Sequence, residues 1–126
     1  MRKVVKNVVF LGTSKSDLSS MPNLVKLSFG HGLHEAQEGR YPLNAKTLSG
    51  FGSANVIELK QTTASGTYRA VYTVQFKNTI YVLHCFKKKS NSGIATPKPD
   101  IDLIKKRLKI AIETEQSNNE VMKNEK

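Results

Sequence analysis

The chain has 126 residues, a length that allows one domain with a modest hydrophobic core. Hydrophobic residues make up 38% of it and charged residues 24%, a composition that suits a soluble globular protein, and no apolar run approaches the length of a membrane span. Twenty Lys and Arg against ten Asp and Glu give a net charge of +10. This charge favours either a negatively charged partner, such as nucleic acid or an acidic protein, or simple solubility.

The N-terminal sequence and the cysteine count predict a cytoplasmic protein without a membrane partner. The apolar stretch within the first 12 residues is too short for a secretory signal, and Lys6 and Asn7 interrupt it. Cys85 is the only cysteine, so it cannot form a disulfide within the chain, and a lone thiol suits a reducing compartment.

The N-terminal part predicts a strand followed by two helices. We expect a short strand over residues 4–11 and a brief helix over residues 15–21. A longer helix follows over residues 22–39, because apolar residues recur along one of its faces at helical spacing: Val25, Phe29, Leu33 and Ala36. Residues 40–54 contain proline and glycine and are expected to form a loop.

The second half predicts a small sheet and a final helix. Strands are expected over residues 55–61, 67–76 and 79–86, and the short turns between them favour an antiparallel meander. Residues 87–98 read as a basic loop, and the last helix follows Pro99 with one apolar face: Ile101, Ile104, Leu108 and Ile112. The predicted class is α+β, with N-terminal helices packed on one face of a small antiparallel sheet of about four strands, and a C-terminal helix.

Charge is distributed unevenly along the last third of the chain. Residues 84–109 carry eight cations against two carboxylates, whereas residues 110–126 carry four carboxylates against two lysines. The end of the sequence is polar and aperiodic, so we expect a single domain over residues 1–112 and a frayed tail over residues 113–126.

Alternation along the strands predicts which side chains share the face of the sheet that is turned away from the N-terminal helices. In the third strand of the meander, Tyr81, Leu83 and Cys85 are expected to face the core, where Cys85 packs rather than reacts. The opposite face is expected to present a mixed group, with a lysine run at its edge: Glu58, Lys60, Arg69, Gln75, His84 and Phe86, then Lys87, Lys88 and Lys89.

This combination of side chains suits phosphodiester chemistry. Cations hold phosphates and offset charge that develops in a transition state, and Phe86 or Tyr81 can stack on a base. Glu58, His84 or a lysine with a lowered pKa can take the proton from a ribose 2′-hydroxyl, a route that requires no metal and no organic cofactor. A simpler interpretation is that Arg69 only pairs with Glu58 across adjacent strands, and that the lysine run is a solubilising loop.

Four segments form an ordered set along the chain: IELK, YRAVY, YVLHCFKKKS and a TP followed by DI before the last helix. Over about residues 5–110, this set resembles the phage-derived, HigB-like branch of the RelE/ParE toxin superfamily. The resemblance implies a small α+β toxin of a type II toxin-antitoxin system, an endoribonuclease or mRNA interferase that cleaves mRNA on the ribosome. It also implies a helix-turn-helix antitoxin as the protein partner.

The resemblance also implies roles for individual residues. Lys60, Arg69 and the lysines that follow Phe86 match the positions that bind phosphate and stabilise the transition state. The expected catalytic group is therefore Lys60, Arg69, Lys87, Lys88, His84 and Glu58, and the expected RNA-binding group is Lys89, Phe86, Tyr81 and Gln75. The identity of the general base stays open between Glu58 and His84.

Two other classes of function remain in competition with the nuclease. The protein could resemble the ParE arm of the same superfamily and inhibit DNA gyrase by binding, or it could be a non-catalytic basic protein that binds RNA or a phage assembly partner. A metal site at His31, His34 and Glu35 is not expected, because the sequence supplies no further ligand at a suitable spacing.

Overall fold

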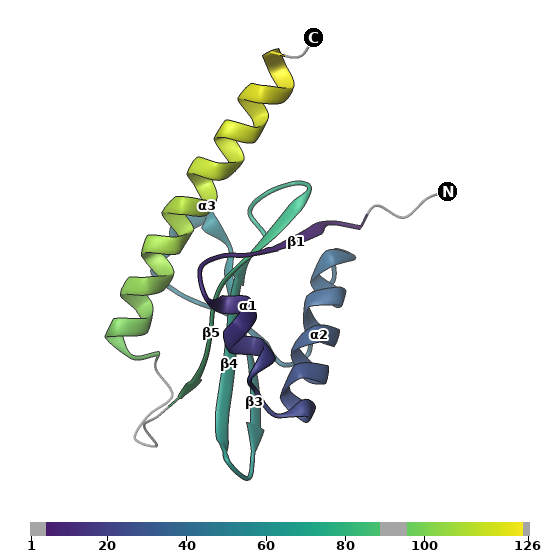
Figure 1. Ribbon diagram of the computed structural model, residues 1–126, viewed down its shortest axis with the longest axis vertical. Helices are drawn as coiled ribbons and strands as arrows, with labels where there is room; N and C mark the ends of the chain where they lie inside the picture. The colour runs from purple at the N-terminus through teal and green to yellow at the C-terminus, as the bar shows by residue number, and fades with distance from the viewer. Residues whose placement is uncertain (1–4, 89–95, 125–126) are drawn as a thin grey trace.

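The computed structural model describes residues 5–88 and 96–124, and the side chains of residues up to 119. In this part of the chain, one sheet is covered by the two N-terminal helices on one face and by a long C-terminal helix on the other (Figure 1). The elements in chain order are β1 (Asn7–Phe10), α1 (Ser14–Ser19), α2 (Asn23–Gln37), β2 (Ala45–Thr47), the 3-10 helix η1 (Gly52–Ala54), β3 (Val56–Thr63), β4 (Gly66–Thr73), β5 (Thr79–Lys88) and α3 (Lys98–Asn124).

The sheet has five strands in the order β1-β5-β4-β3-β2. The antiparallel meander predicted for β3, β4 and β5 is confirmed, and β2 adds to it as a further antiparallel strand beside β3. β1 instead runs parallel to β5, so the sheet is mixed rather than purely antiparallel. β2 lies within the segment that was expected to be a loop. It was not predicted because three residues are too few to show an alternating pattern.

Each face of the sheet has its own hydrophobic core. The core under α1 and α2 includes Val25, Phe29, Leu33, Leu59, Tyr72, Val82 and Cys85. The core under α3 includes Val56, Val71, Tyr81, Leu83, Ile104, Leu108 and Ala111. The residues of α2 and α3 that were predicted to form the apolar face of each helix therefore largely do face the sheet. The two helices cover opposite faces of it.

A one-residue bulge in β5 explains an error in the predicted faces. Tyr72 of β4 lies opposite Val82, whereas the preceding Val71 lies opposite His84, so Leu83 is an extra residue between them. Such a residue reverses the alternation that follows it. Tyr81 and Leu83 therefore pack under α3, while Cys85 packs under α1 and α2, and the prediction that all three share one face is wrong.

α2 approaches the sheet closely at one glycine. A Cβ atom placed on Gly32 would lie 2.8 Å from Leu59 Cδ1 of β3, which is closer than real side-chain contacts. Glycine normally weakens a helix interior by about 1 kcal/mol relative to alanine. At this position it allows the helix to sit against β3, so the residue that weakens the helix improves its packing.

α3 is longer than the sequence indicated. Residues 113–124, which were expected to belong to a frayed tail, continue the helix as far as Asn124. Ile104, Leu108 and Ala111 hold its first half against the sheet, and Arg107 Nη1 donates a hydrogen bond of 2.9 Å to the Leu83 carbonyl. Among the described residues, no helix combines the length and the apolar character that crossing a membrane requires.

Candidate functional site

A cleft of about 390 Å³ opens on the α3 side of the sheet, beyond the residues that the helix covers. Strands β2, β3 and β4 lie side by side there, with Lys46 opposite Glu58 and Lys60 opposite Arg69. The lining residues are Asn44, Lys46, Glu58, Lys60, Thr62 and Arg69. The register of the strands therefore brings together Glu58, Lys60 and Arg69, as the alternation pattern predicted.

Glu58 and Arg69 form a buried ion pair at the bottom of this cleft. Arg69 Nη1 donates to Glu58 Oε1, and the two residues are only 3% and 2% exposed, respectively. The other carboxylate oxygen, Oε2, accepts a hydrogen bond of 2.9 Å from Thr96 Oγ1, which lies just before α3. The pairing considered as an alternative role for Arg69 is thus present, and it orients the guanidinium within the cationic cleft.

Lys88, the last residue of β5, adds positive charge to the same side of the sheet. Loss of hydration and the positive charges of Arg69, Lys60 and Lys46 lower the pKa of the Lys88 ammonium, and Glu58 partly opposes this shift. The shift indicates that the cations lie close enough to repel one another. A site of this kind favours a polyanionic ligand, because a bound phosphate relieves the repulsion.

Lys87 lies on the other face of the sheet, because successive strand residues point to opposite sides. It is opposite Tyr68 in the register, and its Nζ atom lies 5.7 Å from the centroid of the Tyr68 ring. The expectation that Lys87 acts beside Arg69 and Lys88 is therefore contradicted by the geometry. Lys89, the third lysine of the run, lies outside the described residues.

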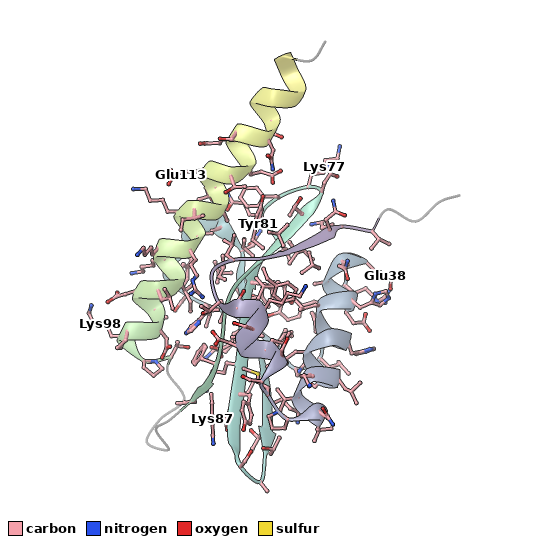
Figure 2. The ribbon with its side chains drawn as sticks, in the orientation of Figure 1. Glu38, Lys77, Tyr81, Lys87, Lys98 and Glu113 are labelled. Carbon is pink, nitrogen blue, oxygen red and sulfur yellow. The ribbon has the colours of Figure 1, made fainter. Side chains whose placement is uncertain are left out.

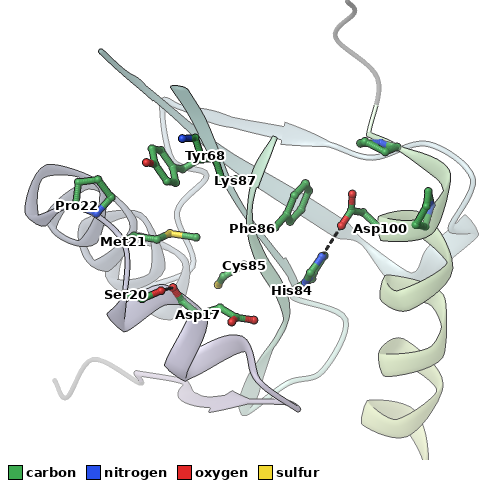
Figure 3. A pocket seen from close by; sticks show the side chains of 12 residues that line it. Asp17, Ser20, Met21, Pro22, Tyr68, His84, Cys85, Phe86, Lys87 and Asp100 are labelled. Atoms are coloured by element: carbon green, nitrogen blue, oxygen red, sulfur yellow. Dashed lines mark hydrogen bonds and ion pairs between the residues drawn. The ribbon is translucent and has the colours of Figure 1, made fainter. Parts of the chain in front are cut away.

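His84 and Phe86 lie beside the cleft rather than within it. Their rings stack with centroids 4.4 Å apart, and His84 Nε2 is 2.7 Å from Asp100 Oδ1 in the first turn of α3 (Figure 3). Both residues line a second, larger hollow of about 840 Å³ that extends to Met21 and the end of α1. His84 is buried and engaged with α3, so the structure does not favour it as the general base.

Two predicted RNA-binding residues are placed away from the cleft. Tyr81 is 1% exposed, its hydroxyl donates a hydrogen bond of 2.9 Å to Glu115 Oε1, and its ring packs edge-on against Phe76, so it cannot stack on a base. Burial, followed by the contact with Glu115, raises the pKa of Tyr81 to about 12. Gln75 follows the end of β4 and comes two residues before Lys77, which lies at the opposite end of the sheet from Lys87 (Figure 2).

The structure also identifies site residues that the sequence analysis missed. Lys46 and Asn44 come from β2 and the residues just before it, and Thr96 reaches Glu58 from the far side of the basic segment. Lys46 and Asn44 were missed because β2 is too short to show a pattern. Thr96 belongs to the TP segment before the last helix, but it was assigned no role because its partner Glu58 is 38 positions away.

The histidines of α2 and the single cysteine have structural surroundings rather than catalytic ones. Within residues 5–88 and 96–119, no three His, Cys, Asp or Glu side chains gather in a way that could hold a metal ion. His31 instead pairs with Glu35, and His34 pairs with Glu38, along the surface of α2. Cys85 is buried, and burial raises the pKa of its thiol to about 12, which makes it a poor nucleophile.

Comparison with known proteins places the chain in a sequence family. Residues 16–109 match the family described as phage-derived protein Gp49-like. The fold is similar to that of a double mutant of the E. coli toxin RelE in the free state, with 20% identity, a TM-score of 0.49, and coverage of 69% of this chain and 87% of the other. It is also similar to a chain of the toxin-antitoxin complex RelBE2 from Mycobacterium tuberculosis, with 21% identity, a TM-score of 0.47, and coverage of 71% and 98%. No curated protein matches the sequence.

Proposed function

The chain belongs to the phage-derived Gp49-like family, and from this premise we propose that it is the toxin of a type II toxin-antitoxin system that cleaves mRNA on the ribosome. The observation that carries the proposal is the cluster of Lys46, Lys60, Arg69 and Lys88 around one buried carboxylate. A protein that only blocks another protein by binding has no need for such a group of cations.

The proposed reaction is an attack of a ribose 2′-hydroxyl oxygen on the adjacent phosphorus. A new P–O bond closes a 2′,3′-cyclic phosphate, and the bond to the 5′-oxygen of the next nucleotide breaks. Lys88 in its neutral form takes the hydroxyl proton, and the neighbouring cations that lower its pKa favour this form. Arg69 and Lys46 stabilise the charge on the phosphoryl oxygens, and the Lys60 ammonium donates a proton to the leaving 5′-oxygen.

The shape of the site supports a role for the ribosome. The cleft is small and lies on the face of a sheet, so it offers cations but few surfaces that could hold a flexible RNA strand in one orientation. The ribosome would supply that orientation by holding mRNA in its decoding site, and orientation is worth a large part of a reaction barrier. We propose mRNA and the ribosome as substrate partners, and a helix-turn-helix antitoxin as the neutralising protein.

The test is pulse labelling after controlled induction in a bacterial host. Methionine and thymidine incorporation are followed in parallel for the wild type, for Lys60→Ala in the cleft, and for Lys77→Ala as a matched control. Both lysines are exposed, so neither change disturbs the core. We expect methionine incorporation to stop within minutes in the wild type and in Lys77→Ala, but not in Lys60→Ala. Earlier failure of thymidine incorporation would favour gyrase inhibition and reject the nuclease.

A further inference from the structure

Among the described residues that line the cleft, Glu58 is the only carboxylate, and its two oxygens have different protein partners. Oε1 accepts from Arg69 Nη1 on β4, and Oε2 accepts from Thr96 Oγ1 at 2.9 Å, just before α3. The side chain is buried beneath the cations rather than exposed among them. Both oxygens are therefore engaged by donors that belong to the folded chain.

This arrangement does not suit a group that removes a proton from the substrate. A general base must place an acceptor atom about 2.6–3.2 Å from the hydroxyl that it deprotonates. For Glu58 to do so, the RNA would have to displace either the guanidinium or the threonine hydroxyl, because each carboxylate oxygen already accepts a hydrogen bond within the protein. The geometry instead fits a residue that holds another side chain in place.

We propose that Thr96 and Glu58 form a positioning relay for Arg69, in which Thr96 orients the carboxylate and the carboxylate orients the guanidinium. Lys88 and Arg69 repel each other, and Lys60 lies opposite Arg69 in the strand register, so the carboxylate serves as an anchor that keeps the guanidinium in this cationic cleft. Electrostatic catalysis requires such groups to be in position before the charge develops. The effect of the relay on cleavage rests on the proposed function, whereas its effect on Arg69 does not.

The relay also links the cleft to the beginning of α3. Thr96 is followed by Pro97 and then by the first turn of the helix, where Asp100 contacts His84 of β5. The start of α3 is thus attached to the sheet by two polar contacts, and one of them ends on the carboxylate that holds Arg69. A substitution at Thr96, outside the group of cations, is therefore expected to alter the cleft.

The first test observes Arg69 directly, through the guanidinium signals of the protein in nitrogen-15 NMR, assigned with an Arg69→Lys variant. Thr96→Val removes the hydroxyl and keeps the shape, and Thr96→Ser keeps the hydroxyl. Thr114→Val is the control, because the Thr114 hydroxyl donates to the Ile110 carbonyl of its own helix. We expect Thr96→Val to shift the Arg69 signals and speed their exchange with solvent, and the other two variants to resemble the wild type. Unchanged Arg69 signals in Thr96→Val would overturn the relay.

The second test measures mRNA cleavage on purified ribosomes with the same variants and with Glu58→Gln. We expect Thr96→Val to lower kcat by roughly tenfold to a hundredfold, as a small misplacement of a catalytic group does, with KM within about twofold of the wild type. Thr96→Ser should restore kcat. Glu58→Gln should keep measurable cleavage and the acidic limb of the pH profile, moved to lower pH because the Glu58 carboxylate no longer opposes the lowering of the Lys88 pKa. Loss of the acidic limb of that profile in Glu58→Gln would identify Glu58 as the base and overturn the proposal.

The two tests separate failure of the relay from failure of the proposed function. If the wild type cleaves no mRNA, the nuclease proposal fails, while the Arg69 signals still decide whether the relay exists. If the wild type cleaves mRNA and Thr96→Val leaves both kcat and the Arg69 signals unchanged, the nuclease stands and the relay is rejected. Circular dichroism melting of each variant confirms that it is folded during both measurements.

Discussion

Removing the carboxylate of the buried ion pair should destabilise the protein more than removing its arginine. Glu58→Ala leaves Arg69, 3% exposed, among three lysines with its buried counter-ion gone. Breaking a buried pair in this way costs about 3–5 kcal/mol. Arg69→Ala leaves a carboxylate that keeps its hydrogen bond from Thr96 and lies close to the same lysines, so its cost should be nearer that of one charged hydrogen bond, about 1.5–3 kcal/mol.

Urea unfolding followed by circular dichroism measures this difference. With a slope of about 1–3 kcal/mol per molar urea, a change of 3–5 kcal/mol moves the midpoint by more than about 1 M, which is easily resolved. The double variant should be less destabilised than the sum of the two single variants, because each single variant leaves one charge buried without its partner. The reasoning is refuted if Arg69→Ala destabilises the protein as much as Glu58→Ala, or more.

Two further predictions concern packing and titration. Gly32→Ala should destabilise the protein by about 1–3 kcal/mol, because the added methyl group overlaps a leucine of β3. Gly30→Ala, whose methyl group would meet no atom within 4 Å, should stabilise the protein by up to about 1 kcal/mol. Thermal unfolding of the two variants separates packing from helix propensity, and equal effects would contradict the close approach of α2 to β3. Tyr81 should ionise near pH 12 in ultraviolet titration, because burial and Glu115 raise its pKa. Since this pKa is higher in the folded protein than in the unfolded chain, the associated stability is present below about pH 10 and declines as the pH rises toward 12. Tyr81→Phe should lessen that decline, to which the buried Cys85 thiol also contributes.

The sequence predicted those parts of the fold whose periodicity is strong and local. β3, β4 and α2 carry regular apolar patterns, and their predicted and observed residues largely agree. β2 and the parallel pairing of β1 could not be predicted, because strands of three and four residues show no clear alternation and their partners are distant in the chain. α3 was predicted too short, because the sequence of residues 113–120 is polar and shows no apolar periodicity.

The site residues that a local pattern places were predicted, whereas those that depend on contacts between distant parts of the chain were not. Glu58, Lys60 and Arg69 were predicted to share a face, because alternation within β3 and β4 is unbroken. Lys87 was grouped with Lys88 because β5 was expected to end at Phe86, whereas the strand continues to Lys88 and separates the two lysines. Lys46 lines the cleft and Thr96 reaches Glu58 through tertiary contacts that local sequence patterns do not encode, although Thr96 belongs to the TP segment before the last helix.

The bulge at Leu83 determines which lysine of the run belongs to the cleft. If β5 continued from Val82 without the extra residue, Cys85 would lie opposite Arg69, and Lys87 would share its face. Phe86 and Lys88 would then point toward α1 and α2, and the Cys85 thiol would leave the core. A single inserted residue thus lets the two halves of one strand direct their side chains independently. The half before it fills the hydrophobic cores, and the half after it places Lys88 on the side of the cleft. Homologous chains that retain or lose this residue would be expected to differ in which cation they present to a phosphate, even where their lysine runs are identical.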